Sequence, residues 1–147
     1  MLPGSLPKKA DGLIVTEAKQ ELVKAYSGGA GKGPRYAEVG LSCGPDEEQA
    51  CKTAHHYFRW SLSGWAVLAE LPHDEAFAAA SKHVPVEAMG KAVSCGPSAD
   101  RHLEAIEEYR RIGCDHIILN QIGPDQDFFF DLFEKKLAPA LRKKQAA

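Results

Sequence analysis

The chain has 147 residues, of which 44% are hydrophobic and 26% are charged, and its net charge is -2 with a pI near 6.3. This length predicts a single domain with its own core, and the apolar runs fall far short of the roughly 20 residues that a membrane-spanning helix needs. The near-neutral charge lacks the basic excess that nucleic-acid binding requires. We therefore expect no membrane span and no nucleic-acid partner.

The first residues, 1–8, predict an irregular segment, because two prolines and a glycine precede any apolar run. Such a start lacks the apolar core of a secretory signal, so we expect a cytoplasmic protein. The cysteines form no C-x-x-C pair and show no Cys/His spacing typical of zinc. We expect no metal site and four reduced, structural thiols, at Cys43, Cys51, Cys95 and Cys114.

The first half of the chain alternates strand and helix patterns. "DGLIVT" (11–16) is a short apolar strand, and "EAKQELVKAYSGG" (17–29) has helix formers and a glycine stop. The following "SGGAGKGP" lacks the G-x-x-x-x-G-K-[ST] order of a phosphate loop, so we interpret it as a linker. "RYAEVGLSC" (35–43) predicts a second strand, rich in strand formers.

A long helix is predicted next in "GPDEEQACKTAHHYFRWSLSG" (44–64), with Asp46 as its cap. Residues 64–90 form an insertion of short helices, because Pro72 and Pro85 interrupt any longer one. The adjacent His55 and His56 would point about 100° apart on a helix. That separation favours a surface or half-buried pair over a metal site.

The last part repeats the alternation. "KAVSC" (91–95) is a weak strand, residues 96–113 predict a helix with Ser98 as its cap, and "CDHIILNQ" (114–121) predicts a buried strand in which His116 is structural. Residues 123–144 predict a final helix. Its aromatic cluster is expected to pack against the sheet, and comprises Phe128, Phe129, Phe130 and Phe133.

The tetrapeptide SCGP occurs at 42–45 and 94–97, and a third GP follows at 123–124. Each GP lies between an extended segment and a helix, and a capping residue follows the proline: Asp46, Ser98 or Asp125. The motif therefore marks strand-to-helix turns. Strands that alternate with helices in this way predict a parallel sheet with right-handed crossovers.

The stretch from "CGPSADRHLEAIEEYRRIGCDHIILN" through "QIGPDQDFFFDLFEKKLAPALR" (95–142) resembles the end of luciferase-like oxidoreductases. The resemblance is to the branch that uses coenzyme F420, a deazaflavin, and is of the glucose-6-phosphate dehydrogenase type. It continues through "VPVEAM", "RYAEVGLSCGPDEEQACKTAHHYF" and "ADGLIVT". It implies a (β/α)8 barrel, which needs about 250 residues and eight strands. We therefore expect an incomplete α/β barrel, the C-terminal half, in residues 1–147.

The resemblance also implies where a site would lie. Lys19 matches a lysine that helps to bind the substrate phosphate, with Thr16 and Glu17 at the same barrel mouth; a solvated lysine is the alternative interpretation. Asn120 and Gln121 end the last strand, where either could touch the coenzyme or order the loop. The family's early His, Trp and Glu have no counterparts here, so no catalytic residue is predicted.

Two further phosphate-binding cations of the sugar-phosphate branch fall near Leu68 and within 90–95, and neither is evidently kept, which argues against glucose 6-phosphate. The main hypothesis is a fragment of an F420-dependent oxidoreductase that passes hydride between the coenzyme and a small organic substrate, with FMN as the alternative coenzyme. The other hypothesis is a non-catalytic truncated or split half-barrel. It would need a complementary chain or self-association, as a homo-oligomer. A small α/β binding module is a third, weaker possibility.

Overall fold

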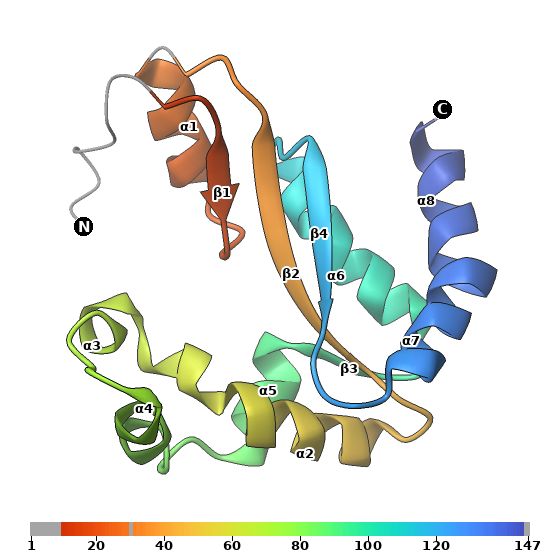
Figure 1. Ribbon diagram of the computed structural model, residues 1–147. Helices are drawn as coiled ribbons and strands as arrows, with labels where there is room; N and C mark the ends of the chain where they lie inside the picture. The colour runs from red at the N-terminus through yellow and green to blue at the C-terminus, as the bar shows by residue number, and fades with distance from the viewer. Residues whose placement is uncertain (1–9, 30, 146–147) are drawn as a thin grey trace. The chain divides into compact units, whose positions relative to one another are not determined.

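A computed structural model describes residues 10–29 and 31–145 of the chain (Figure 1). The expected irregular segment at 1–8 lies outside the described residues. Strands and helices alternate as the sequence predicts. The first elements are β1 (Leu13–Val15), α1 (Gln20–Gly28), β2 (Arg35–Cys43), α2 (Glu47–Phe58) and the short 3-10 helix η1 (Arg59–Ser63).

The predicted insertion of short helices is present as α3 (Trp65–Leu68), α4 (Asp74–Ala80) and α5 (Val86–Ala92). The remaining elements are β3 (Ser94–Gly96), α6 (Ala99–Arg111), β4 (His116–Gln121), α7 (Gln126–Leu132), the π-helical segment η2 (Phe133–Leu137) and α8 (Ala138–Gln145). They fall into two units. Of the described residues, unit 1 comprises 10–29, 31–40 and 100–120, and unit 2 comprises 41–99 and 121–145.

Unit 1 contains a sheet in which β2 is the middle strand. β1 runs parallel to β2, with Leu13 opposite Arg35 and Val15 opposite Ala37. β4 also pairs with β2, and Figure 1 shows it on the other side of β2 from β1. At the start of this pairing, the backbone N–H of Asp115 donates to the carbonyl of Arg35 at 2.8 Å.

The two faces of this sheet differ in burial. Val15 and Val39 are 2% and 3% exposed, and α6, whose Ile106 is 1% exposed, crosses on one side of β2 and β4 (Figure 1). On the alternate positions, Ile14 is 67% exposed and Ile118 is 45% exposed. The predicted position of the last strand is confirmed, but its predicted burial is wrong. The reason is that only one face of the sheet carries a helix layer among the described residues.

Unit 2 is built around α2 and the end of β2. β3 runs parallel to that end, with Leu41 opposite Ser94 and Cys43 opposite Gly96. α2 packs on both β3 and α5. The buried cluster that results combines small and aliphatic side chains, namely Ala50, Ala54, Val84, Met89, Val93, Cys95 and Ile122.

The three GP turns do connect a strand to a helix, but their glycines differ. Gly96 and Gly123 both have φ of +96°, a conformation that favours glycine, whereas Gly44 is not among the glycines with positive φ. A Cβ at Gly123 would lie 2.3 Å from the Thr53 Cγ2 atom. The predicted cap at Asp46 is confirmed, since its Oδ1 accepts from the backbone N–H of Gln49 at 2.7 Å. Asp125 occupies the N-cap position of α7 but makes no side-chain cap bond.

The final helix is not a single α-helix. α7 and α8 are joined by η2, a π-helical turn, and Pro139 lies in the first turn of α8. Proline has no N–H, and its ring clashes with the carbonyl four residues earlier, so a wider turn relieves the conflict around Lys135. Phe129 is 8% exposed and touches Phe133 with ring centroids 6.0 Å apart, but Phe130 is 60% exposed. The predicted aromatic packing therefore holds for Phe129 and is wrong for Phe130.

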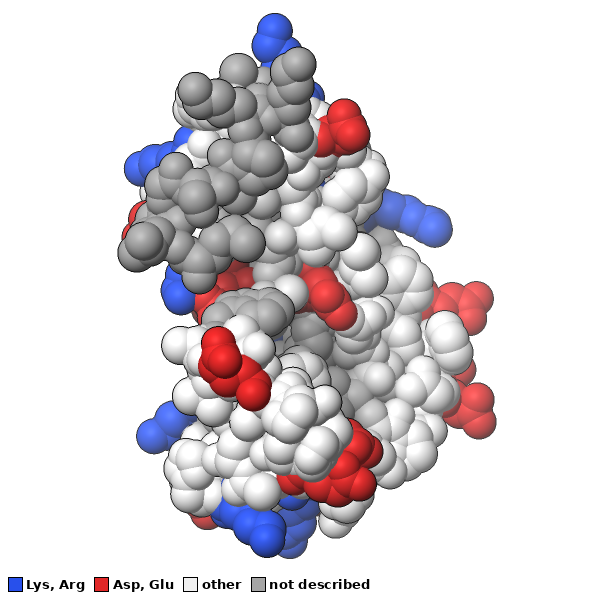
Figure 2. Space-filling model, turned by 60° about the vertical axis from the view of Figure 1, so that its left-hand side comes forward, with Lys and Arg blue, Asp and Glu red and all other residues white. Residues whose placement is uncertain are grey.

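Charged side chains of both signs are scattered over the view in Figure 2, and neither sign forms a broad continuous surface there. This agrees with the net charge of -2. Among the described residues, no helix has both the length and the hydropathy needed to cross a membrane.

Candidate functional site

The first group of candidate residues follows β1 in unit 1. Lys19 is the N-cap residue of α1, and its ammonium forms an ion pair with the Glu17 carboxylate; the side chains are 62% and 46% exposed. The hydrogen bond and charge of Glu17 raise the pKa of Lys19. The structure thus brings Glu17 and Lys19 together at the carboxyl end of a parallel strand. The ammonium reaches solvent, where an anionic group could contact it.

Tyr109 holds this strand end in place. Its hydroxyl donates to the backbone carbonyl of Thr16 at 3.0 Å, from α6 to the residue that follows β1. Burial raises the pKa of the Tyr109 hydroxyl. The sequence pattern placed Tyr109 only on the apolar face of its helix. The contact with Thr16 spans 93 residues, and no local signal predicts it.

In unit 1, Asn120 at the end of β4 donates a hydrogen bond from its Nδ2 to the Glu38 carboxylate on β2. Glu38 is exposed, and sequence analysis did not single it out. The amide and the carboxylate lie on the sheet face opposite α6. Together they form a polar position between the end of β4 and the middle of β2, with the carboxylate able to accept further hydrogen bonds.

Gln121 plays a different part in unit 2. Its Oε1 accepts from the backbone N–H of Cys43, and its Nε2 donates to the carbonyl of the same residue, both at 3.0 Å. The side-chain amide therefore satisfies both polar groups of one peptide residue at the end of β2. This arrangement orders the two strand ends. The coenzyme contact that was considered for Gln121 stays a prediction.

The helices that follow the strand ends in unit 2 carry acidic residues at their starts. The N-terminus of α2 is capped by Asp46 and has Glu47 and Glu48 in its first turn. α7 has Asp125 at its N-cap position and Asp127 in its first turn. A helix N-terminus attracts anions, but carboxylates at the same place neutralise that attraction. Of these strand ends, the one after β1 is therefore the better fit for an anionic ligand.

The four cysteines form no disulfide in the described part of the chain, and two of them lie in surroundings that disfavour ionisation. Burial raises the pKa of Cys43 to about 12, and burial also raises the pKa of Cys114. A thiol must ionise to act as a nucleophile. The prediction of reduced, structural thiols agrees with these surroundings.

Two of the histidines have structural contacts. His55 makes a 2.7 Å hydrogen bond between its Nε2 and the carbonyl of Val84. His116 stacks on Tyr36 with ring centroids 4.7 Å apart. These contacts agree with the structural interpretation of both residues.

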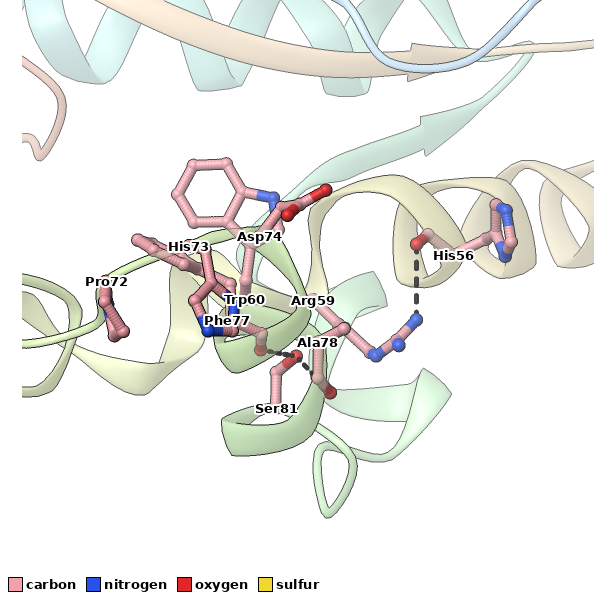
Figure 3. Close-up of a pocket in the computed structure, with 9 residues that line it drawn as sticks. All are labelled: His56, Arg59, Trp60, Pro72, His73, Asp74, Phe77, Ala78 and Ser81. Carbon is pink, nitrogen blue, oxygen red and sulfur yellow. Dashed lines mark hydrogen bonds between the residues drawn. The ribbon is translucent and has the colours of Figure 1, made fainter.

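Unit 2 also contains a surface cavity of about 410 Å³ beside the insertion (Figure 3). Trp60 and Phe77 meet there edge to face, with ring centroids 6.0 Å apart. The polar groups are already engaged within the unit: the Ser81 hydroxyl donates to the carbonyl of Phe77 at 2.8 Å, and the Arg59 guanidinium donates to that of His56 at 3.2 Å. What the cavity offers a ligand is mainly aromatic surface.

His73, Asp74 and Glu75 bring three potential metal-ligand atoms within 4.8 Å of one another at the start of α4. All three side chains are exposed, and His73 Nδ1 already pairs with the Glu75 carboxylate at 2.9 Å. A hydrogen bond with Glu75 lowers the pKa of Asp74. The group fits the solvated acidic start of a helix.

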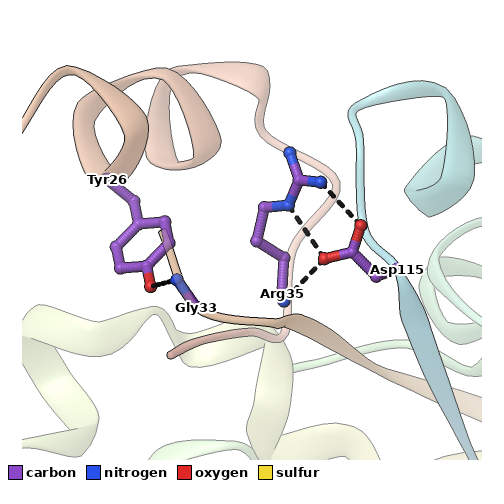
Figure 4. Close-up of polar contacts among 4 residues, drawn as sticks. All are labelled: Tyr26, Gly33, Arg35 and Asp115. Carbon is purple, nitrogen blue, oxygen red and sulfur yellow. Dashed lines mark hydrogen bonds and ion pairs between the residues drawn. The ribbon is translucent and has the colours of Figure 1, made fainter. Parts of the chain in front are cut away.

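At the other end of the sheet in unit 1, Arg35 and Asp115 join the starts of β2 and β4 (Figure 4). The guanidinium donates to both carboxylate oxygens, Nε at 3.0 Å and Nη2 at 2.6 Å, and the backbone N–H of Arg35 donates to Oδ2 at 3.0 Å. Figure 4 also shows the Tyr26 hydroxyl, which accepts from the backbone N–H of Gly33 at 2.9 Å. In barrels the amino ends of the strands serve stability, so this cluster is structural.

Similar sequences agree with the geometry. The chain is 29% identical over 152 residues to the F420-dependent glucose-6-phosphate dehydrogenase of Nocardia farcinica (strain IFM 10152), and the one from Segniliparus rotundus is 30% identical over 152 residues. In both cases 92% of this chain is covered. The chain is a homologue of the F420-dependent glucose-6-phosphate dehydrogenases. It spans only 44% of the length of these two relatives. No family model matches the chain.

Solved structures of two F420-dependent enzymes are similar to this chain in fold. An F420-dependent secondary alcohol dehydrogenase in complex with an F420-acetone adduct has a TM-score of 0.63 at 19% identity, over 86% of this chain and 42% of that chain. The coenzyme F420-dependent tetrahydromethanopterin reductase from Methanopyrus kandleri has a TM-score of 0.61 at 20% identity, over 90% and 46%. The expected α/β fold is confirmed, as an open and incomplete sheet like part of those TIM barrels.

Proposed function

We propose that this chain supplies the C-terminal part of an F420-dependent oxidoreductase barrel, in which hydride passes between the deazaflavin and a small organic substrate. The observation that carries the proposal is that relatives named for F420 dependence match 92% of the chain. The coenzyme carries the hydride chemistry, and the protein provides binding and orientation. The other part of the barrel would complete the pocket.

The residues after β1 would contact an anionic group of the substrate or coenzyme. Lys19 presents a solvent-accessible ammonium, and Glu17 partly neutralises it and limits where it can reach. The Tyr109 hydroxyl, bonded to the carbonyl of Thr16, keeps the strand end in register. Asn120, hydrogen-bonded to Glu38, would present polar groups from the same sheet, and Gln121 would hold the loop after β4.

The substrate would be an alcohol-like molecule with little negative charge. A sugar phosphate needs several cations, and the resemblance implies that a phosphate-binding lysine of the sugar-phosphate branch would fall near Leu68, where it is not evidently kept. The acidic starts of α2 and α7 further disfavour a phosphate in unit 2. We infer that glucose 6-phosphate is not the substrate. A cytoplasmic location is part of the proposal, and four cysteines that form no disulfide among the described residues are consistent with a reducing compartment.

A non-catalytic half-barrel is the second candidate. It is favoured by the sheet face of unit 1 that carries Ile14, which is 67% exposed. On this interpretation the chain binds no coenzyme alone. FMN remains the alternative coenzyme for the first candidate.

Titration of the purified chain with F420 and with FMN, followed by coenzyme fluorescence, tests the proposal, while light scattering gives the mass of the species. We expect micromolar binding of F420, weaker binding of FMN, and a several-fold loss of F420 affinity in Lys19→Met. The control is Lys52→Met, which breaks an ion pair of similar exposure with Glu48 on α2 and should leave F420 binding unchanged. Binding of neither coenzyme would refute the first candidate in favour of the second.

A further inference from the structure

The surface cavity beside the insertion in unit 2 has the size and the lining of a small-molecule site (Figure 3). Its volume of about 410 Å³ falls within the roughly 300–1,000 Å³ that is typical of ligand pockets. Trp60 and Phe77 supply aromatic surface, and Pro72 and Ala78 add aliphatic surface. The proposed function uses none of these residues.

Trp60 is already ordered at the wall of this cavity. Its indole N–H donates to the carbonyl of Tyr57 at 3.1 Å. Its ring meets Phe58 and Phe77 edge to face, with ring centroids 4.9 Å and 6.0 Å apart, and the residue is still 36% exposed. A ligand that packs on an ordered ring restricts little additional side-chain motion. Because aromatic rings attract one another in offset or edge-to-face pairs, the wall favours a flat aromatic ligand.

Arg59 brings a positive charge to the cavity, with one edge of its guanidinium unengaged. Its Nη1 donates to the carbonyls of His55 and His56, at 3.5 Å and 3.2 Å. These bonds occupy one nitrogen, and Nε and Nη2 have no partner among the described residues. Nε and Nη2 are the two nitrogens with which Arg35 binds both carboxylate oxygens of Asp115. Arg59 can therefore bind a carboxylate through the same pair of nitrogens.

The other charged groups at the cavity are engaged with one another at the start of α4. Asp74 shares a hydrogen bond with Glu75, and His73 Nδ1 pairs with the Glu75 carboxylate at 2.9 Å. In the described part of the chain, no ion pair joins Asp74 to Arg59. The guanidinium thus keeps its charge and two of its nitrogens for a ligand, and Asp74 opposes an anion only at its own side of the cavity.

We propose that this cavity binds a small planar aromatic carboxylate, with its ring against Trp60 and Phe77 and its carboxylate on Nε and Nη2 of Arg59. The charge of Arg59 favours an anion over a neutral molecule of the same shape. The aromatic wall favours a ring over an aliphatic acid. The binding is reversible and involves no covalent step. The inference does not rest on the proposed function, and either can fail without the other.

Isothermal titration calorimetry of the full chain, with no coenzyme present, tests the proposal. Three ligands share one ring system and differ in charge: naphthoate, naphthylmethanol and naphthylmethylammonium. We expect naphthoate to bind about tenfold more tightly than the neutral alcohol, because it adds a charge-assisted contact with two hydrogen bonds, and the cation to bind most weakly. In Arg59→Gln the affinity for naphthoate should fall to that for naphthylmethanol. The affinity for the alcohol should stay unchanged, which would show that the cavity is intact.

Two further variants locate the ligand. Ala78→Phe adds a ring at an exposed position of the cavity wall without a change of charge, so it should weaken the binding of all three ligands several-fold and keep the melting temperature of the parent chain. The matched control is Arg142→Gln on α8, because Arg142 is an exposed cation of unit 2 that does not line the cavity. It should bind all three ligands as the parent does.

A parent chain that binds none of the three ligands overturns the proposal, and so does one that binds the cation most tightly. An equal loss of affinity for naphthoate and naphthylmethanol in Arg59→Gln overturns it too, since the guanidinium would then support the wall and not hold the carboxylate. Undiminished binding in Ala78→Phe would place the ligand elsewhere and has the same consequence.

Discussion

Replacing Asp115 with Asn removes the charge that Arg35 holds at the start of the sheet in unit 1. Three hydrogen bonds from Arg35 converge on this carboxylate, two from the guanidinium and one from the backbone N–H. Charge-assisted bonds contribute about 1.5–3 kcal/mol when shielded, and exposed ion pairs about 0.2–1 kcal/mol. With side chains 32% and 38% exposed, the pair lies between these cases, so we expect a loss of about 1–2 kcal/mol in the free energy of unfolding.

The stability that the Arg35–Asp115 pair contributes should also depend on pH. The hydrogen bonds from Arg35 lower the pKa of Asp115 in the folded chain. Because the pKa of Asp115 is lower in the folded chain, the ion pair contributes fully to the free energy of unfolding above the unfolded-state pKa of about 3.9. This contribution is lost as the pH falls through the pKa of the folded state. The difference between parent and Asp115→Asn should therefore be constant from about pH 5 to 8, and it should shrink below about pH 4.

Urea unfolding followed by far-UV circular dichroism measures this difference, provided that the slope with denaturant is the same in both chains. The control is Asp131→Asn, which breaks an exposed pair with Lys135 four residues away on α7 and η2 and should cost less than Asp115→Asn. The reasoning is refuted if Asp115→Asn costs no more than this control. It is also refuted if the difference persists undiminished at pH 2.

Two further predictions concern the turns and the thiols. Gly123→Ala should destabilise the chain by about 2–3 kcal/mol, because a left-handed residue with a Cβ costs about 1–2 kcal/mol and that Cβ would lie 2.3 Å from Thr53. Gly44→Ala should change the free energy of unfolding by no more than about 0.5 kcal/mol, since the atom nearest to its added Cβ would be 3.5 Å away. Thermal unfolding compares the two variants. Equal losses of stability would contradict the account of the GP turns. A disulfide reagent at pH 8 should label the half-buried Cys51 well before Cys43, whose pKa is about 12, as peptide mapping would show; early labelling of Cys43 would contradict its burial.

Local patterns predicted the elements well where the signal lies within a few residues. β2 has the predicted bounds, Arg35–Cys43, because strand formers there are followed directly by a GP turn. Asp46 caps α2 as expected for a carboxylate before a helix. The short helices of the insertion follow from the two prolines that interrupt them.

The remaining features depend on residues far apart in the chain. The exposure of Ile118 could not be read from an apolar run, since such a run is the same whether one face or both faces of a strand are covered. The pairing of Gln121 with Cys43 spans 78 residues, and no periodicity encodes it. The same holds for Tyr109 at Thr16. The sequence placed the candidate residues at strand ends, and the structure showed their hydrogen-bond and ion-pair partners.

The hydrogen bonds between Gln121 and Cys43 bear on how the residues between these two positions can change in evolution. The side chain of Gln121 closes a loop of 78 residues on Cys43, and this loop contains the insertion with α3, α4 and α5. The entropy of closing a loop grows only with the logarithm of its length, so that lengthening it by half costs roughly 0.4 kcal/mol. Long-range closure also slows folding more than it weakens the folded state. The insertion can therefore be exchanged, shortened or extended at little thermodynamic cost while the strands stay unchanged.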